Sequence, residues 1–128
     1  MVPVVGWEAS TTGTRPEEGG GAYLIVLRHV VVAQDIALTL SDHDPGAPVI
    51  LATATAEALR LLEGAPRLKV AFVAEAPQAF AGSALEAAIA ARGGRPVLIG
   101  EAAEADPMGY AVLLRPFTTA AVLGHLEA

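Results

Sequence analysis

Short apolar runs and segments of helical spacing alternate along this chain from Tyr23 onward. Residues 23–27 form a continuous apolar run of strand length, as expected for a strand that is buried on both faces. From Val31 to about Ser41 the apolar positions instead follow helical spacing. The same alternation continues to the end of the chain, and it predicts further strands at 49–52, 68–73, 96–99 and 111–114.

Capping residues and helix breakers set the expected helix boundaries. Thr53 or Thr55 can cap a helix that runs to about Glu63. Residues 83–92 form an Ala- and Leu-rich helix with Ser83 as its cap, stopped by the glycines at 93 and 94. A last helix starts at Thr118, which is a suitable N-cap, and runs toward residue 127. Residues 42–46, which include a Pro-Gly pair, are interpreted as a turn.

The alternation of strands and helices predicts an α/β fold with a doubly wound parallel sheet of five strands and helices on both faces. Only residues 100–110 join the last two strands, and they contain Pro107 and Gly109. We therefore expect the fourth helix to be shortened or missing. Residues 1–21 are rich in turn and linker residues and are predicted to be a flexible N-terminal tail before a single domain at 22–128.

Composition narrows the classes of function. The chain has 128 residues, a mean hydropathy of +0.49 and only 5% aromatics, so the core must consist of Ala, Val, Leu and Ile. The absence of cysteine excludes disulfides and thiolate metal sites and favours the cytoplasm. No apolar run is long enough to span a membrane, and no signal peptide is apparent. The net charge of −6 and the scattered basic residues argue against nucleic-acid binding.

Three segments, taken in order, resemble the receiver domain of bacterial two-component response regulators, over about residues 23–128. They are the Leu-Leu-Arg-Pro-Phe-Thr segment at 113–118, the apolar strand at 24–27 followed by Arg28 and His29, and the Pro-Val-Leu-Ile strand at 96–99. The resemblance implies a flavodoxin- or CheY-like fold with strand order 2-1-3-4-5. It also implies a cis peptide bond before Pro116.

The chemistry of that family is phosphorylation of an Asp after the third strand, assisted by Mg²⁺ that an acid pair after the first strand holds. Oxygen ligands suit Mg²⁺, and cations stabilise the transferring phosphoryl group. In this chain the acceptor position falls on Ala74, which has no nucleophile, and the acid pair falls on Arg28 and His29, or on Leu27 if the register slips by one. The resemblance therefore implies the fold but a degenerate phosphorylation site.

Two further positions of the family's site also depart from its pattern. The Thr or Ser position falls near Gly100 or Glu101, and the Lys position is Arg115. Arg28 and Arg115 could face one crevice near Glu75 and Glu101, so an internal Arg–Glu pair could fill the space of metal and phosphate; alternatively, these side chains point to water. Glu75 follows Ala74 directly and could replace it as the phosphoacceptor if the strand end bends. Because strand side chains alternate, we expect it instead to turn away as a solvated loop acid.

No conventional catalytic or metal site is predicted. The histidines at 29, 43 and 125 lack metal-ligand spacing, Asp42 and Asp44 are interpreted as turn residues, and no nucleophile–base pair is visible. We expect no enzyme activity, no metal and no cofactor.

The expected function is a phosphorylation-independent receiver-like domain that binds proteins in signal transduction. The expected partners are a histidine kinase, a phosphotransfer protein or another regulator, and a homodimer could form through the same surface. The alternative is a small anionic ligand held between Arg28 and Arg115 in the crevice at the carboxyl ends of the strands. The predicted interaction surface comprises Val112, Leu114, Phe117 and Val122.

Overall fold

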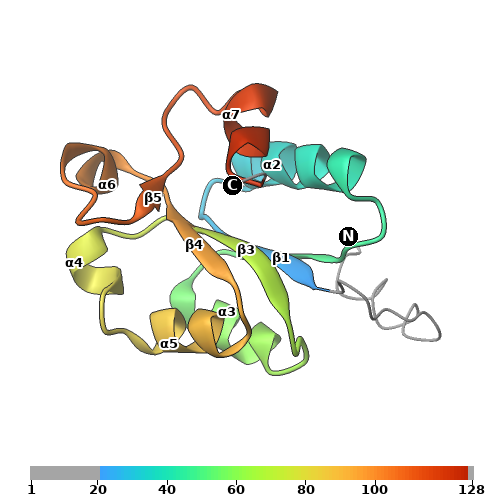
Figure 1. Cartoon of the computed structure of the whole chain (residues 1–128), viewed down its shortest axis with the longest axis horizontal. Helices are drawn as coiled ribbons and strands as arrows, with labels where there is room; N and C mark the ends of the chain where they lie inside the picture. Colours follow the sequence, from blue (N-terminus) through green and yellow to red (C-terminus); the bar gives the residue numbers. More distant parts are fainter. Residues whose placement is uncertain (1–20, 127–128) are drawn as a thin grey trace.

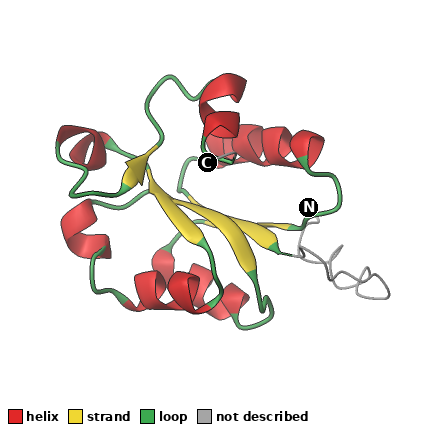
Figure 2. Cartoon of the chain, viewed as in Figure 1, coloured by secondary structure: helices red, strands yellow, loops and turns green. Residues whose placement is uncertain are grey.

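A computed structural model describes residues 21–126 of the chain (Figure 1). The tail predicted at 1–21 therefore lies outside the described residues, apart from Gly21. The described part contains one sheet with helices on both of its faces (Figure 2).

Five parallel strands form the sheet in the order β2-β1-β3-β4-β5. This is the flavodoxin- or CheY-like order, so the predicted fold class and strand order are confirmed. The central strands are buried on both faces, which explains why they read as unbroken apolar runs. The strands are β1 (Ala22–Val26), β2 (Val49–Ala52), β3 (Leu68–Val73), β4 (Arg95–Leu98) and β5 (Ala111–Val112).

Helices α2 and α7 cover one face of the sheet, and α3 and α5 cover the other (Figure 1). Successive side chains of β1 point to opposite faces of the sheet and so join two separate cores. Leu24 belongs to the core under α3 and α5, whereas Ile25 belongs to the core under α2 and α7. Both cores consist almost wholly of aliphatic residues, as the composition predicts. The helices are α2 (Val30–His43), α3 (Thr55–Leu62), α4 (Pro77–Phe80), α5 (Ala84–Ala91), α6 (Glu101–Ala105) and α7 (Thr119–Gly124).

Two of the predicted helix caps are confirmed and one is wrong. The Ser83 hydroxyl accepts a hydrogen bond from the Glu86 backbone N–H, and the Thr118 hydroxyl accepts one from the backbone N–H of residue 121. The N-cap of α3 is instead residue 54. The Thr53 N–H and hydroxyl both donate to the Glu57 carboxylate, at 2.8 and 3.1 Å. Thr53 thus binds the first turn of α3 from one position earlier than a cap.

Other boundaries differ from the predicted ones. Helix α2 continues to His43, so Asp42 is helical rather than part of a turn. The fourth helix is shortened as predicted, to the five residues of α6, and β5 has only two residues instead of the expected four. Helix α4 was not predicted. Its single turn is too short to show a helical period, although Pro77 at its first position is a start signal.

The end of α5 shows why two glycines follow it. Gly93 has a φ of +78°, and the Gly94 N–H returns to the Ile89 carbonyl, which closes the helix. A Cβ on Gly94 would lie only 2.9 Å from the Leu68 Cβ, so the chain can pass close to β3 only with glycine there. The predicted stop at 93 and 94 is therefore confirmed.

Candidate functional site

The loops after β1, β2 and β3 surround an open hollow of about 760 Å³. Parallel strands bring their carboxyl ends to one edge of the sheet, and the winding direction reverses between β1 and β3. Ligand sites of open α/β sheets form at such switch points. The lining residues are Val26, Leu27, Arg28, His29, Thr53, Ala54, Thr55, Ala74 and Glu75.

The structure brings together three of the degenerate phosphorylation-site positions. Ala74 follows β3 and is exposed, and its N–H donates to the Val26 carbonyl, which places it beside the end of β1. Arg28 and His29 lie across the same hollow, on the exposed link between β1 and α2. A methyl group, a guanidinium and an imidazole therefore line this part of the hollow. This set supplies positive charge but no carboxylate.

Glu75 also lines this hollow, contrary to the expectation that it turns away from Ala74. The Glu75 N–H donates to the Val73 carbonyl at 3.1 Å, which is the short i to i−2 bond of a γ-turn. The chain bends at the end of the strand, so strict alternation of side chains no longer applies there.

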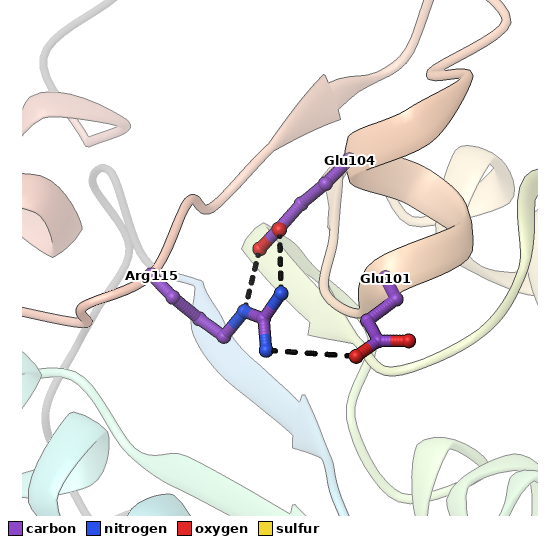
Figure 3. A network of polar contacts seen from close by, with 3 residues as sticks. All are labelled: Glu101, Glu104 and Arg115. Carbon is purple, nitrogen blue, oxygen red and sulfur yellow. Dashed lines mark hydrogen bonds and ion pairs between the residues drawn. The ribbon is translucent and has the colours of Figure 1, made fainter.

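Arg115 is engaged elsewhere (Figure 3). Its Nε and Nη2 donate to the two carboxylate oxygens of Glu104 on α6, at 3.0 and 2.9 Å, and Nη1 lies 3.9 Å from Glu101. The hydrogen bonds from Arg115 lower the pKa of Glu104. Bidentate pairing of this kind fixes the guanidinium plane. Arg115 thus pairs with Glu104, which was not predicted, and the predicted partner Glu101 makes only the longer contact.

The expectation that Arg28 and Arg115 share one crevice is wrong, because Arg115 is not part of the hollow's lining. The short α6 carries Glu104 to Arg115 and draws that side chain toward the β4–β5 side of the sheet. The Arg115–Pro116 peptide bond is cis, as expected from the resemblance.

The predicted interaction surface is smaller than expected. Leu114 is 58% exposed, but Val112 and Phe117 are half-buried against the core. Val122 is 1% exposed and therefore cannot take part in such a surface. Phe117 and Val122 occupy the two positions of a hydrophobic staple around the Thr118 cap, and both join the core under α2 and α7. That spacing is the sequence signal that would have placed Val122 inside.

Larger exposed apolar side chains gather on α2, where no surface was predicted. Val31 is 71% exposed and Leu38 is 64% exposed, and Val30 precedes them at the start of the helix. The apolar residues of this segment divide between two sides of the helix. Helical spacing separates them, because Ile36 and Leu40 point inward and Val31 and Leu38 lie on the opposite side.

A polar cluster lies at the opposite, amino edge of the sheet. The Asp44 carboxylate accepts hydrogen bonds from the Lys69 ammonium at 2.6 Å and from the Tyr23 hydroxyl at 3.0 Å. Burial of Tyr23 and its bond to Asp44 raise the pKa of the phenol. Asp44 therefore joins the end of α2 to β1 and β3 and is not simply a turn residue.

The described residues include no group of three or more His, Asp or Glu side chains placed to hold a metal ion. Within residues 21–126, no helix is long and apolar enough to cross a bilayer.

Near the end of α7, burial lowers the pKa of His125, and Arg95 donates to the His125 carbonyl. The hydrogen bond from Arg95 joins the end of α7 to β4.

Comparison of the chain with protein-family models, with curated proteins and with solved structures gives no match.

Proposed function

We propose that this chain is a receiver-like domain that acts in two-component signal transduction as a protein-interaction module, without phosphorylation. The observation that carries the proposal is Ala74 at the carboxyl end of the central strand β3, within the 2-1-3-4-5 sheet order. The family resemblance supplies the signalling context, and the residues at the hollow supply the argument against its chemistry.

Phosphoryl transfer to a protein side chain needs a nucleophile and, in this family, oxygen ligands for Mg²⁺. Ala74 offers no nucleophile, and Arg28 places a positive charge where a divalent cation would need carboxylates. Arg115 already has its guanidinium bound by Glu104. A domain with these features keeps the sheet order of a receiver but lacks the groups for its phosphorylation chemistry, so its output depends on binding.

The surfaces available for binding are the exposed Leu114 beside β5 and the apolar side of α2. Exposed apolar side chains that cluster on one face mark interaction sites more often than isolated ones do. The partner class that fits the proposal is a histidine kinase, a phosphotransfer protein or another regulator in the cytoplasm.

Incubation with acetyl phosphate and Mg²⁺ should add no phosphoryl group to the protein. The physical reason is that Ala74 has no nucleophilic group and that the described residues include no carboxylate cluster that could hold Mg²⁺. Intact-mass spectrometry measures the result, with a phosphorylatable receiver in the same tube as the positive control. A phosphate located on Glu75 by peptide mapping would refute phosphorylation independence.

The partner side of the proposal is tested by affinity capture of the tagged full chain from its native cell. Enrichment of a kinase, a phosphotransfer protein or a regulator, reduced by Leu114→Asp but not by Gln78→Asp on α4, supports the proposal. Gln78 is exposed and lies on a different element, so it controls for a general effect of added charge. If both variants capture the partner as well as the unchanged chain does, Leu114 is not part of the binding surface.

A second candidate function is favoured by the hollow itself. Arg28 and His29 line a space of about 760 Å³, which falls in the size range of small-molecule sites. A small anion is the ligand class that their charge would select.

If this second function holds, inorganic phosphate or a small dicarboxylate should raise the melting temperature of the protein, and Arg28→Ala should abolish the rise. Arg115→Ala is the matched control, because Arg115 lies outside the lining. Equal shifts in both variants would exclude the hollow as the anion site.

A further inference from the structure

The outward side of α2 carries two large exposed apolar side chains. Val31 and Leu38 are seven residues apart, which is two helical turns, so they lie on the same side of the helix. Gln34 and Asp35 occupy the exposed positions between them. The side opposite is buried on the sheet through Ala33, Ile36 and Leu40.

We propose that this side of α2 is the contact with a second copy of the chain, with the two α2 helices packed antiparallel about a two-fold axis. The midpoint between Gln34 and Asp35 is equally far from Val31 and from Leu38. A two-fold axis at that point places Val31 of one copy on Leu38 of the other, and the reverse. Both pairs of exposed apolar side chains are then covered by one self-complementary contact, as two-fold interfaces require.

Charge complementarity supports this occupant. In the same register Asp42, near the end of one α2, lies beside Arg28, just before the start of the other. Both residues are exposed, and the ion pairs among the described residues involve other side chains. Antiparallel pairing therefore forms two equivalent Asp42–Arg28 contacts between the copies. Arg28 also lines the hollow, so Asp42 of the second copy would complete the rim of the candidate site.

One unfavourable pair and the short length of α2 together limit the affinity of this contact. Asp35 lies on the same flank as Asp35 of the second copy, and two carboxylates near each other repel. The 14-residue helix is about 21 Å long, so the interface is at the small end of specific contacts. We expect a dissociation constant on the order of 100 μM, and a self-association that depends strongly on concentration.

Sedimentation equilibrium of the full chain between about 10 μM and 1 mM tests the proposal. The expected result is a monomer–dimer equilibrium that Leu38→Asp weakens by about tenfold or more, since it buries a charge against an apolar partner. Leu114→Asp, which places the same charge beside β5, is the matched control and should leave the equilibrium unchanged. A chain that stays monomeric throughout, or a dimer that only Leu114→Asp disrupts, would overturn the proposal.

Charge reversal tests the register. Arg28→Asp and Asp42→Arg should each weaken the dimer, and the double variant should restore it, because the pair is re-formed with its signs exchanged. Asp35→Asn should tighten the dimer by removing the repulsion. A double variant that is as weak as the two singles would refute the antiparallel register. The proposal depends on α2 and on Arg28 just before it, and it stands or falls independently of phosphate labelling and of partner capture.

Discussion

Replacing Phe80 by alanine is expected to lower the free energy of unfolding by about 3–5 kcal/mol, the usual range for truncating a buried Phe. Phe80 is 0% exposed and belongs to the core under α3 and α5. It is the buried aromatic anchor of α4, which has only four residues. Its ring also packs edge-on against Tyr110, with centroids 5.4 Å apart. Small domains are stable by only about 5–15 kcal/mol, so this loss is a large fraction of the whole.

Chemical denaturation of the Phe80→Ala chain measures the effect at a concentration where the protein is monomeric. Phe117→Ala is the matched control, because Phe117 is half-buried and its removal leaves less empty space. Phe80→Leu should recover part of the loss, since it refills most of the volume. Equal losses at Phe80 and Phe117 would show that burial on α4 does not carry the predicted weight.

The loop that holds Tyr110 shows how this packing reaches the neighbourhood of Arg115. The Tyr110 hydroxyl donates to Glu86 at 2.6 Å, and Glu86 also accepts from the Gly82 N–H at the start of α5. Tyr110 lies directly before β5, and β5 leads to Arg115. The segment from Tyr110 through β5 to Arg115 is therefore held at its start by the packing of Tyr110 on the buried Phe80.

The fold class could be predicted from the sequence because its signals are local. Unbroken apolar runs mark buried parallel strands, and Ser83 and Thr118 mark helix starts that the structure confirms. Helix α4 escaped prediction because a single turn has no measurable period. The last two residues of α2 escaped prediction because Asp44, which follows them, is held by partners on β1 and β3, far away in the sequence.

The candidate site was predictable where it depends on strand order alone. Arg28, His29 and Ala74 follow adjacent strands, so their meeting at one edge follows from the topology. The partner of Arg115 was harder to assign, since it depends on where the short helix α6 lies. Glu104 is one turn beyond Glu101, which was the predicted partner, and it offers both oxygens to the guanidinium. Side-chain pairing of this kind depends on the tertiary structure and not on the local sequence pattern.

The second large effect is expected at the amino edge of the sheet, where Asp44→Ala should cost about 1–2 kcal/mol. The change removes the acceptor of two hydrogen bonds, one of them from the Lys69 ammonium. Partial exposure of Asp44 and Lys69 keeps the value at the lower end for charged bonds. Denaturation at neutral pH measures the loss. Asp42→Ala, two residues earlier on the exposed side of α2, should change it little.

The same cluster should make stability fall at both ends of the pH scale. Burial alone would raise the pKa of Asp44, but the hydrogen bonds from Lys69 and Tyr23 outweigh it, and the net pKa is lowered. Its contribution is therefore present above the unfolded pKa of about 3.9 and is lost as the pH falls through the folded pKa.

Tyr23 has the opposite sign. Burial first, and then its bond to Asp44, raise the pKa of the phenol in the folded protein. Its contribution is complete below the unfolded pKa of about 10 and is lost as the pH rises toward the folded pKa. Denaturation across pH should show a shallower acid limb for Asp44→Ala and a shallower alkaline limb for Tyr23→Phe. Profiles that run parallel to the unchanged protein at both limbs would mean that the cluster is not coupled to folding.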